Sequence, residues 1–139
     1  MGNHYKKRLL PSDRQIISMR KEYPQFKSRR EGKNILFTGE LKVKPEFPSY
    51  TVSILYRHDK SPHVKILSPT LVDKPPHFYQ STGTLCLYLP KNYRWSKHRL
   101  ISKEIVSWTA GWIYFYEIWL QTGKWFGPEA KHNTDKKNE

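Results

Sequence analysis

One cysteine stands out among the residues that could do chemistry. Cys86 is the single thiol of the chain and follows Gly83 by three residues, within the segment HFYQSTGTLCLYLP at residues 77–90. A thiolate attacks acyl groups without a metal or a second cysteine, so Cys86 is a candidate nucleophile that could carry a covalent intermediate. The competing interpretation is a small buried hydrophobic residue between Leu85 and Leu87.

The composition limits the remaining chemistry. At 139 residues the chain fits one domain with a single core. One cysteine excludes an internal disulfide and a cysteine-rich zinc site. The six histidines leave other metal sites open, but we predict neither a metal nor a cofactor. Lys and Arg number 25 against 12 Asp and Glu, a net charge of +13, which favours acidic partners or nucleic acid.

No segment has the character of a secretory signal or a membrane span. The most apolar segment, residues 108–120, is too short to cross a bilayer and contains Glu117. With a single cysteine, these features predict a soluble cytoplasmic protein. We expect a flexible basic arm at residues 1–10, one domain at residues 11–130 and a disordered polar tail at residues 131–139.

An N-terminal helix should follow the arm. Ser12 and Gln15 have the spacing of a capping box, Met19 recurs on the apolar face, and Pro24 ends the helix. Its other side and the loop after it carry basic residues, which are Arg14, Arg20, Lys21, Lys27, Arg29, Arg30 and Lys33. This basic surface is either a docking face for an acidic partner or an ordinary solvated surface.

Three strands should form an antiparallel meander next. Alternating apolar residues predict them at residues 34–43, 50–56 and 63–67. A proline-containing irregular loop at residues 68–82 then leads into Cys86, and such a loop in a compact domain is usually functional. Together with a second helix near the C-terminus, these elements predict an α+β fold.

The second helix should be long and rich in tryptophan. It is expected to begin between Leu100 and Glu104 and to end at Gly123. Apolar residues recur every three or four positions, at Ile101, Ile105, Trp108, Trp112, Phe115 and Trp119. We expect these side chains to pack in the core, the alternative being an exposed stacking surface for a ligand or a base. Residues 125–128 should pack back onto the domain.

The order of the elements and several short motifs resemble a known family. An N-terminal helix, a meander, a cysteine-bearing irregular segment and a long C-terminal helix are similar to the ubiquitin-conjugating fold. Ubiquitin-conjugating enzymes place His-Pro-Asn before Gly-x-x-Cys-Leu, and His77 precedes Gly83-Thr84-Leu85-Cys86-Leu87 at similar spacing. The chain resembles more closely the bacterial branch associated with type II CBASS antiphage systems. The motifs that carry this second resemblance are at residues 77–79, 83–88, 116–119 and 122–127.

This resemblance implies a transferase activity. Cys86 would accept the C-terminus of a protein as a thioester and pass it to an amine, and in this branch that protein is a cyclic-oligonucleotide synthase (CD-NTase) that the conjugation primes for antiphage signalling. In the family the histidine that corresponds to His77 mainly buttresses the loop, although a tuning role is also open. Tyr79 stands where the asparagine would be. The oxyanion donor is therefore Tyr79, Gln80 or a backbone amide.

Further residues are candidates for helping this reaction. Asp73 and His98 could assist deprotonation of the amine, and His132 could reach back from the C-terminal segment. A groove for the extended C-terminal peptide would use cationic side chains to meet its carboxylates, namely Arg94, Lys97 and Arg99. The chain has no Gly-rich phosphate loop, so the acyl group should arrive already activated, from a separate activating enzyme or by exchange.

Two other functions compete with this transferase. The same fold could act without chemistry, as a binding module that recruits or stabilises the synthase. The +13 charge could instead drive nucleic-acid binding. We rank nucleic-acid binding last because positive charge is common and is dispersed along this chain, whereas the arrangement of His, Gly, Cys and Trp is not common.

Overall fold

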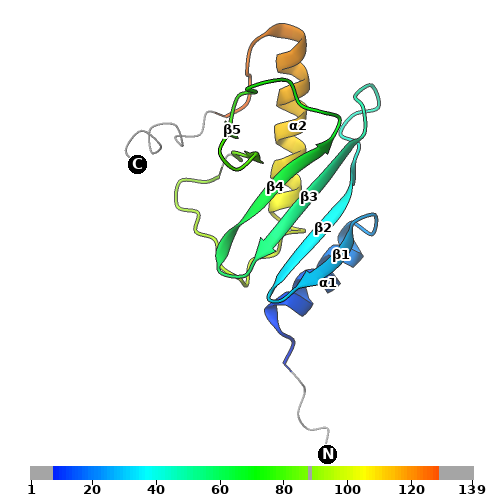
Figure 1. Ribbon diagram of the computed structural model, residues 1–139, viewed down its shortest axis with the longest axis vertical. Helices are drawn as coiled ribbons and strands as arrows, with labels where there is room; N and C mark the ends of the chain where they lie inside the picture. Colours follow the sequence, from blue (N-terminus) through cyan, green and yellow to red (C-terminus); the bar gives the residue numbers. More distant parts are fainter. Residues whose placement is uncertain (1–7, 88, 129–139) are drawn as a thin grey trace, which may run out of the picture.

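The structure is a computed structural model, and it describes residues 8–87 and 89–128 (Figure 1). Most of the expected basic arm, the whole expected tail and His132 therefore lie outside the described residues. The elements run in the order α1 (Pro11–Glu22), β1 (Lys27–Glu31), β2 (Asn34–Leu41), β3 (Tyr50–Arg57), β4 (Lys60–Ser68), β5 (Phe78–Tyr79), β6 (Thr84–Leu85) and α2 (Ile105–Thr122). An N-terminal helix, an antiparallel sheet and a C-terminal helix confirm the α+β class predicted from the sequence.

The main sheet is an antiparallel meander in the order β1-β2-β3-β4. The sequence predicted its last three strands but treated residues 27–33 as a loop, which is wrong, because residues 27–31 form the edge strand β1. Every residue of β1 is exposed. A strand that buries neither face has no apolar alternation, so the pattern that reveals the other strands is missing here.

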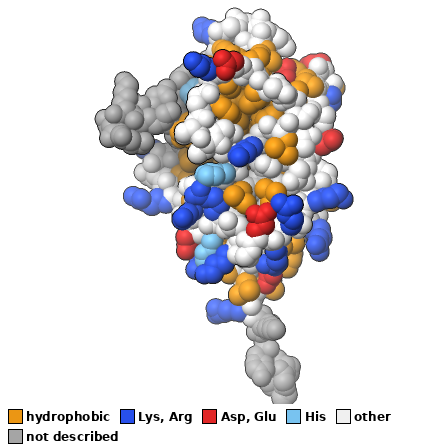
Figure 2. Space-filling view, in the orientation of Figure 1, with side chains coloured by type: hydrophobic (Ala, Val, Ile, Leu, Met, Phe, Trp, Pro, Cys, Tyr) orange, Lys and Arg blue, Asp and Glu red, His pale blue; other side chains and the backbone are white. Residues whose placement is uncertain are grey.

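The basic side chains of β1 have partners close by. Arg30 donates hydrogen bonds to Ser12, at 3.0 Å, and to the carboxylate of Asp13, both in α1. Arg29 forms an ion pair with Glu31 at 2.7 Å. On the face seen in Figure 2, Lys and Arg side chains are interspersed with acidic and uncharged ones. The visible pattern is that of a solvated surface more than of a single cationic patch.

The core lies between the sheet and α2, which crosses behind β3 and β4 in Figure 1. Alternate side chains of β2 and β3 point into it, and Phe37 pairs with Ile54 across the two strands. Tyr50 at the start of β3 donates a hydrogen bond to the buried carboxylate of Glu117 in α2. Burial first, and then this carboxylate, raise the pKa of Tyr50 well above its ordinary value. The hydroxyl stays protonated and ties the sheet to the helix.

The N-terminus of α1 differs from the sequence prediction. The residue before the helix is Leu10, whose backbone N–H lies 3.4 Å from the Asp13 carboxylate, so the capping box predicted at Ser12 and Gln15 is wrong. Gln15 is buried, donates to the carbonyl of Arg99 at 2.6 Å and accepts from the amide of Ile101 at 3.0 Å. Because the Gln15 side chain makes these long-range hydrogen bonds, it does not cap the helix as its local spacing predicted. The same bonds fix the segment that leads into α2.

Helix α2 ends as predicted, at Gly123, whose φ of 78° lies in the left-handed region that favours glycine. It begins at Ile105, one residue after the predicted range. Of the predicted apolar stripe, Ile105 and Trp112 are buried, whereas Trp108, Phe115 and Trp119 are only half-buried. Within the two described stretches of chain, neither helix has the length and apolar character needed to span a membrane.

Candidate active site

Cys86 is placed by a short hairpin. Strands β5 and β6 pair antiparallel, with Tyr79 opposite Thr84, and the amide of Gly83 donates to the carbonyl of Tyr79 at 2.8 Å. Gly83 has φ of 70°, which glycine adopts without strain and which lets the chain turn back this tightly. The amide of Cys86 then donates to the carbonyl of His77 at 2.9 Å. The hairpin thus brings together the two residues whose spacing the sequence had singled out.

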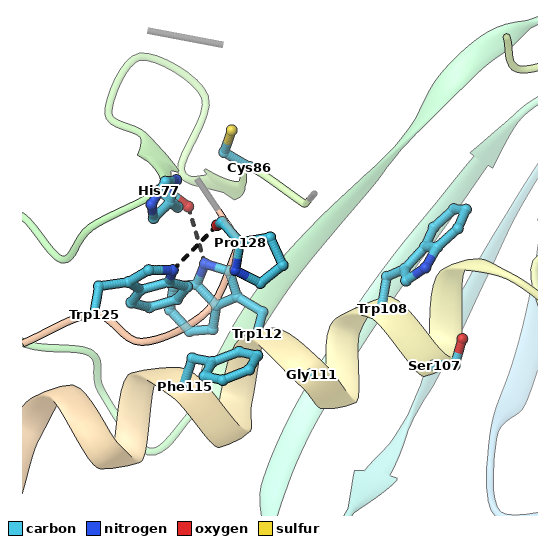
Figure 3. Close-up of a pocket in the computed structure, with 9 residues that line it drawn as sticks. All are labelled: His77, Cys86, Ser107, Trp108, Gly111, Trp112, Phe115, Trp125 and Pro128. Carbon is cyan, nitrogen blue, oxygen red and sulfur yellow. Dashed lines mark hydrogen bonds between the residues drawn. The ribbon is translucent and has the colours of Figure 1, made fainter. Parts of the chain in front are cut away.

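The His77 carbonyl joins the hairpin to α2. It accepts a second hydrogen bond, from the indole Nε1–H of Trp112 at 3.0 Å. The backbone of His77 has φ of 51°, a conformation that non-glycine residues rarely adopt, and its ring centroid lies 4.7 Å from that of Trp125 (Figure 3). Contacts on both the backbone and the ring hold His77 in this conformation.

A pocket with about 480 Å³ of empty space, part of it open to solvent, lies beside Cys86. Its walls include His77, Cys86, Trp108, Trp112, Phe115 and Trp125. Although Cys86 is only 5% exposed, it belongs to this lining, and in Figure 3 its sulfur is directed away from the ring of Trp112. Cys86 is therefore a buried residue beside an aromatic cavity, and its sulfur is directed away from the Trp112 wall of that cavity.

The segment after Cys86 supports one wall of the pocket. Tyr93 packs edge-on against Trp108, with ring centroids 5.3 Å apart. Its hydroxyl donates to Glu104 at 2.9 Å, and Arg99 donates to the same carboxylate at 3.0 Å while lying 4.3 Å from the Tyr93 ring centroid. Burial, assisted by Glu104, raises the pKa of Tyr93 above its ordinary range, so the hydroxyl keeps its proton.

The loop before His77 is tied to α2 in the same way. The amide of Val72 donates to the hydroxyl of Tyr116 at 2.9 Å. The ring of Tyr116 stacks on that of Trp112, with centroids 5.0 Å apart, and burial raises the pKa of its hydroxyl. The same helical face therefore holds the irregular loop through Tyr116 and the hairpin through Trp112.

The other predicted site residues do not line the pocket. Tyr79 is half-buried in β5, and Gln80 is exposed at the turn of the hairpin. Asp73 and Arg94 are exposed on their loops, as is His98, whose amide donates to Ser96 at 3.2 Å. The carbonyl of Lys97 accepts hydrogen bonds from Gln15 and Tyr56. His132 lies outside the described residues.

The sequence interpretation missed the aromatic pocket. It assigned Trp108, Trp112 and Phe115 to the core, because a helical stripe of aromatic residues looks the same over a core and over a cavity. One signal was available, namely Gly111 in the middle of this stripe, since a glycine is unfavourable inside a helix. In the part of the chain that the structure describes, no group of three or more His, Cys, Asp and Glu residues is arranged to hold a metal ion.

The comparisons with known proteins give one family. A family model described as Type II CBASS E2 protein matches residues 15–133, which is well over half of the chain. The match includes Cys86, His77 and every residue that lines the pocket. Among curated proteins, no sequence matches this one.

Proposed function

Because this chain belongs to the type II CBASS E2 protein family, we propose that it is an E2-like conjugating protein with Cys86 as its nucleophile. Cys86 carries the C-terminus of another protein as a thioester and transfers it to an amine. The carried protein is the cyclic-oligonucleotide synthase of the same CBASS system, and its conjugation primes antiphage signalling. The architecture that presents Cys86 is the ubiquitin-conjugating fold, in line with the observed order of helix, meander, hairpin and helix.

The reaction has two steps that share one sulfur. The Cys86 thiolate attacks the activated carbonyl carbon, a carbon–sulfur bond forms, and the leaving group departs with the bonding electron pair. The acceptor amine then attacks the same carbon, the carbon–nitrogen bond forms, and the carbon–sulfur bond breaks to regenerate the thiolate. The amine loses its proton to a base or to water. No metal takes part, and a separate activating enzyme or an exchange reaction supplies the activated acyl group.

The observation that carries this proposal is the position of Cys86 in the lining of the pocket. Cys86 is buried between Leu85 and Leu87, as a structural cysteine would be, but unlike them it also lines the pocket. The backbone of Cys86 is fixed by its hydrogen bond to His77, and its sulfur is directed away from the aromatic rings. A fixed backbone favours repeated attack by the thiol from one geometry.

The surrounding residues would divide the remaining tasks. His77 buttresses the hairpin through its carbonyl, in line with its two hydrogen bonds. Tyr79 and Gln80 are the side-chain candidates for stabilising the oxyanion, since Tyr79 pairs with Thr84, two residues before Cys86, across the hairpin. The proposed assisting bases are Asp73, His98 and His132, and the proposed contacts to the carried tail are Arg94, Lys97 and Arg99. The Glu104 carboxylate already pairs with Arg99, so that residue contributes least of the three cations.

Intact-mass analysis tests this function. The chain is co-expressed with its genomic neighbours and purified with and without a thiol reductant. We expect an adduct whose mass is the sum of the two proteins less one water. The thiol reductant should cleave this adduct. With Cys86→Ser the adduct should persist in reductant and be cleaved by hydroxylamine, because an oxygen ester replaces the thioester. With Cys86→Ala no adduct should form, although the variant should fold.

The competing function gives a different result. If wild-type protein forms no adduct, and Cys86→Ala still binds the synthase and supports antiphage signalling, the chain acts as a binding module without chemistry. That outcome would overturn the proposed transfer and leave membership of the family intact.

A further inference from the structure

Close packing does not explain why residue 111 is a glycine. A Cβ added at Gly111 would meet no atom within 4 Å, although the residue lies in the middle of α2. Two other glycines are different, because a Cβ would come within 2.6 Å of Phe26 at Gly39 and of Phe115 at Gly127. Those two are required by close packing. Alanine at position 111 would fit and would stabilise the helix.

The space that Gly111 leaves open belongs to the pocket beside Cys86. Gly111 lines that pocket together with Trp108 before it and Trp112 after it, and Figure 3 places it on the helix between these aromatic residues. A side chain at this position would project into the cavity and fill part of it. The glycine therefore enlarges the pocket at a cost in helix stability, as expected of a position shaped by a ligand.

The lining defines what chemistry the ligand has. Apart from His77 and Cys86, the described residues that line the pocket carry no titratable group, and most of them are aromatic or otherwise apolar. A charged side chain would lose its hydration there without gaining an ionic partner, whereas a bulky apolar side chain would be buried against rings. The occupant is therefore apolar.

We propose that this pocket is a subsite for one bulky apolar side chain in the last few residues of the polypeptide that Cys86 carries, and that Gly111 sets the size of side chain it accepts. The proposal rests on the thioester function proposed above. An acyl chain on Cys86 begins on a residue that lines the pocket, at a sulfur that is directed away from Trp112. The terminal residue then lies outside, and a residue shortly before it reaches back, since each residue spans about 3.3–3.6 Å.

Binding of short peptides tests the subsite without requiring any chemistry. The probes are hexapeptides with a free C-terminus that differ only by Ala, Leu or Trp at one of the three positions before the terminal residue. Binding to the Cys86→Ala variant is measured by isothermal titration calorimetry, because the Trp peptide would itself contribute to tryptophan fluorescence. At one position, Leu or Trp should bind about 10- to 100-fold more tightly than Ala, as expected for burying one large apolar side chain.

Substitutions at Gly111 give the second half of the test. In the Cys86→Ala background, Gly111→Leu should remove the preference for Leu and Trp peptides over the Ala peptide. Gly111→Ala should weaken the preference while raising the melting temperature by about 1–4 °C. The matched control is Gln121→Leu, which adds the same side chain at an exposed position of α2 outside the pocket. It should change neither the peptide preference nor the melting temperature.

The two proposals fail separately. The same peptides, supplied as thioesters to the protein with Cys86 intact, report whether the thiol accepts an acyl group. If the peptides load with equal rates and bind with equal affinity at all three positions, the transfer function stands and the subsite is refuted. If binding shows the preference but no peptide loads, the subsite stands and the thioester function is refuted. Retention of the preference in Gly111→Leu would also overturn the role of Gly111.

Discussion

The sheet with α2 and the segment from residue 68 to residue 104 hold their structure by different means. In the sheet and α2, periodic apolar side chains are fully buried, such as Phe37, Ile54 and Ile113. Beyond the end of β4 at Ser68, the described residues of this segment form only two strands, of two residues each. Leu85, Leu87 and Ile101 anchor it in the core. Between these anchors its backbone is fixed by single polar atoms, such as the His77 carbonyl.

This difference separates stability from site geometry. Buried apolar area contributes most of the free energy of folding, so the sheet and α2 should determine whether the domain folds. Each hydrogen bond to the loop segment contributes little net stability but fixes where one backbone atom lies. Substitutions in the sheet or α2 should therefore destabilise the fold. Substitutions that remove a hydrogen bond to the loop segment should displace Cys86 in a molecule that stays folded.

The largest expected effect is in the core. Ile113→Ala removes a side chain that is 0% exposed, and we expect the free energy of unfolding to fall by about 2–5 kcal/mol because a cavity remains. Chemical denaturation measures this change. The control is Leu120→Ala on the same helix, where the side chain is 45% exposed and the effect should stay within about 0.5 kcal/mol. The adduct formed per folded Ile113→Ala molecule should equal that of wild type. A large drop would show that the two regions are not separable.

A smaller loss of stability with a larger loss of function is expected at Trp112. Trp112→Phe keeps an aromatic ring but removes the N–H that donates to the His77 carbonyl. We expect a loss of about 1–3 kcal/mol, which combines the hydrogen bond and a small cavity. The rate of Cys86 acylation should fall about tenfold or more, because misplacing the nucleophile is costly.

The control for this substitution is Trp119→Phe. Trp119 is half-buried on the same helix, stacks on Tyr116 at 6.0 Å between ring centroids, and does not line the pocket. The Trp119→Phe variant should be less stable than wild type, but its rate of Cys86 acylation should not fall to the same extent as in Trp112→Phe. Hydrogen exchange at the Cys86 amide should accelerate in Trp112→Phe and stay slow in Trp119→Phe. Equal exchange in the two variants would refute the positioning role of the indole N–H.

The same division explains which parts of the fold the sequence could predict. Strands β2 and β3 and helix α2 could be predicted from apolar periodicity, since each buries one face. In β4 only Val64 is buried, and the sequence predicted the middle of this strand but not its ends. Strand β1 buries no face and was missed. The position of His77 beside Cys86 agreed with the spacing of the two residues, because a hairpin over a glycine turn is a local structure.

Long-range polar contacts could not be predicted from a single sequence. Gln15 accepts a hydrogen bond from the amide of Ile101, which lies 86 residues further along the chain. Nothing in the local pattern distinguishes Gln15 from a capping residue. The carbonyl of His77 is a backbone atom, so no residue type reveals that it accepts from Trp112. Helical spacing put the aromatic residues of α2 on one side but could not show that part of that side faces a cavity beside Cys86.

The smallest expected effect is a pH dependence that belongs to the sheet. His63 in β4 lies on the opposite side of the strand from the buried Val64, and Arg57 approaches its Nε2 atom at 2.7 Å. Burial, then the charges of Arg57 and Lys65, lower the pKa of His63 below its ordinary value of 6.5. The folded state therefore keeps His63 neutral at a pH where the unfolded chain takes up a proton. The free energy of unfolding should fall as the pH drops below about 6.5.

Denaturant titrations at about pH 7.5 and about pH 5.5 measure this effect in wild type and in His63→Gln. The variant should lose less stability on acidification than wild type, since glutamine cannot take up the proton, and the difference should be smaller than either loss above. Hydrogen exchange at the Cys86 amide should be the same in both proteins at neutral pH, because no described contact links His63 to the hairpin. Equal acid sensitivity in the two proteins would show that His63 is not the group responsible. A change at the Cys86 amide would instead show that the sheet and the site segment are coupled.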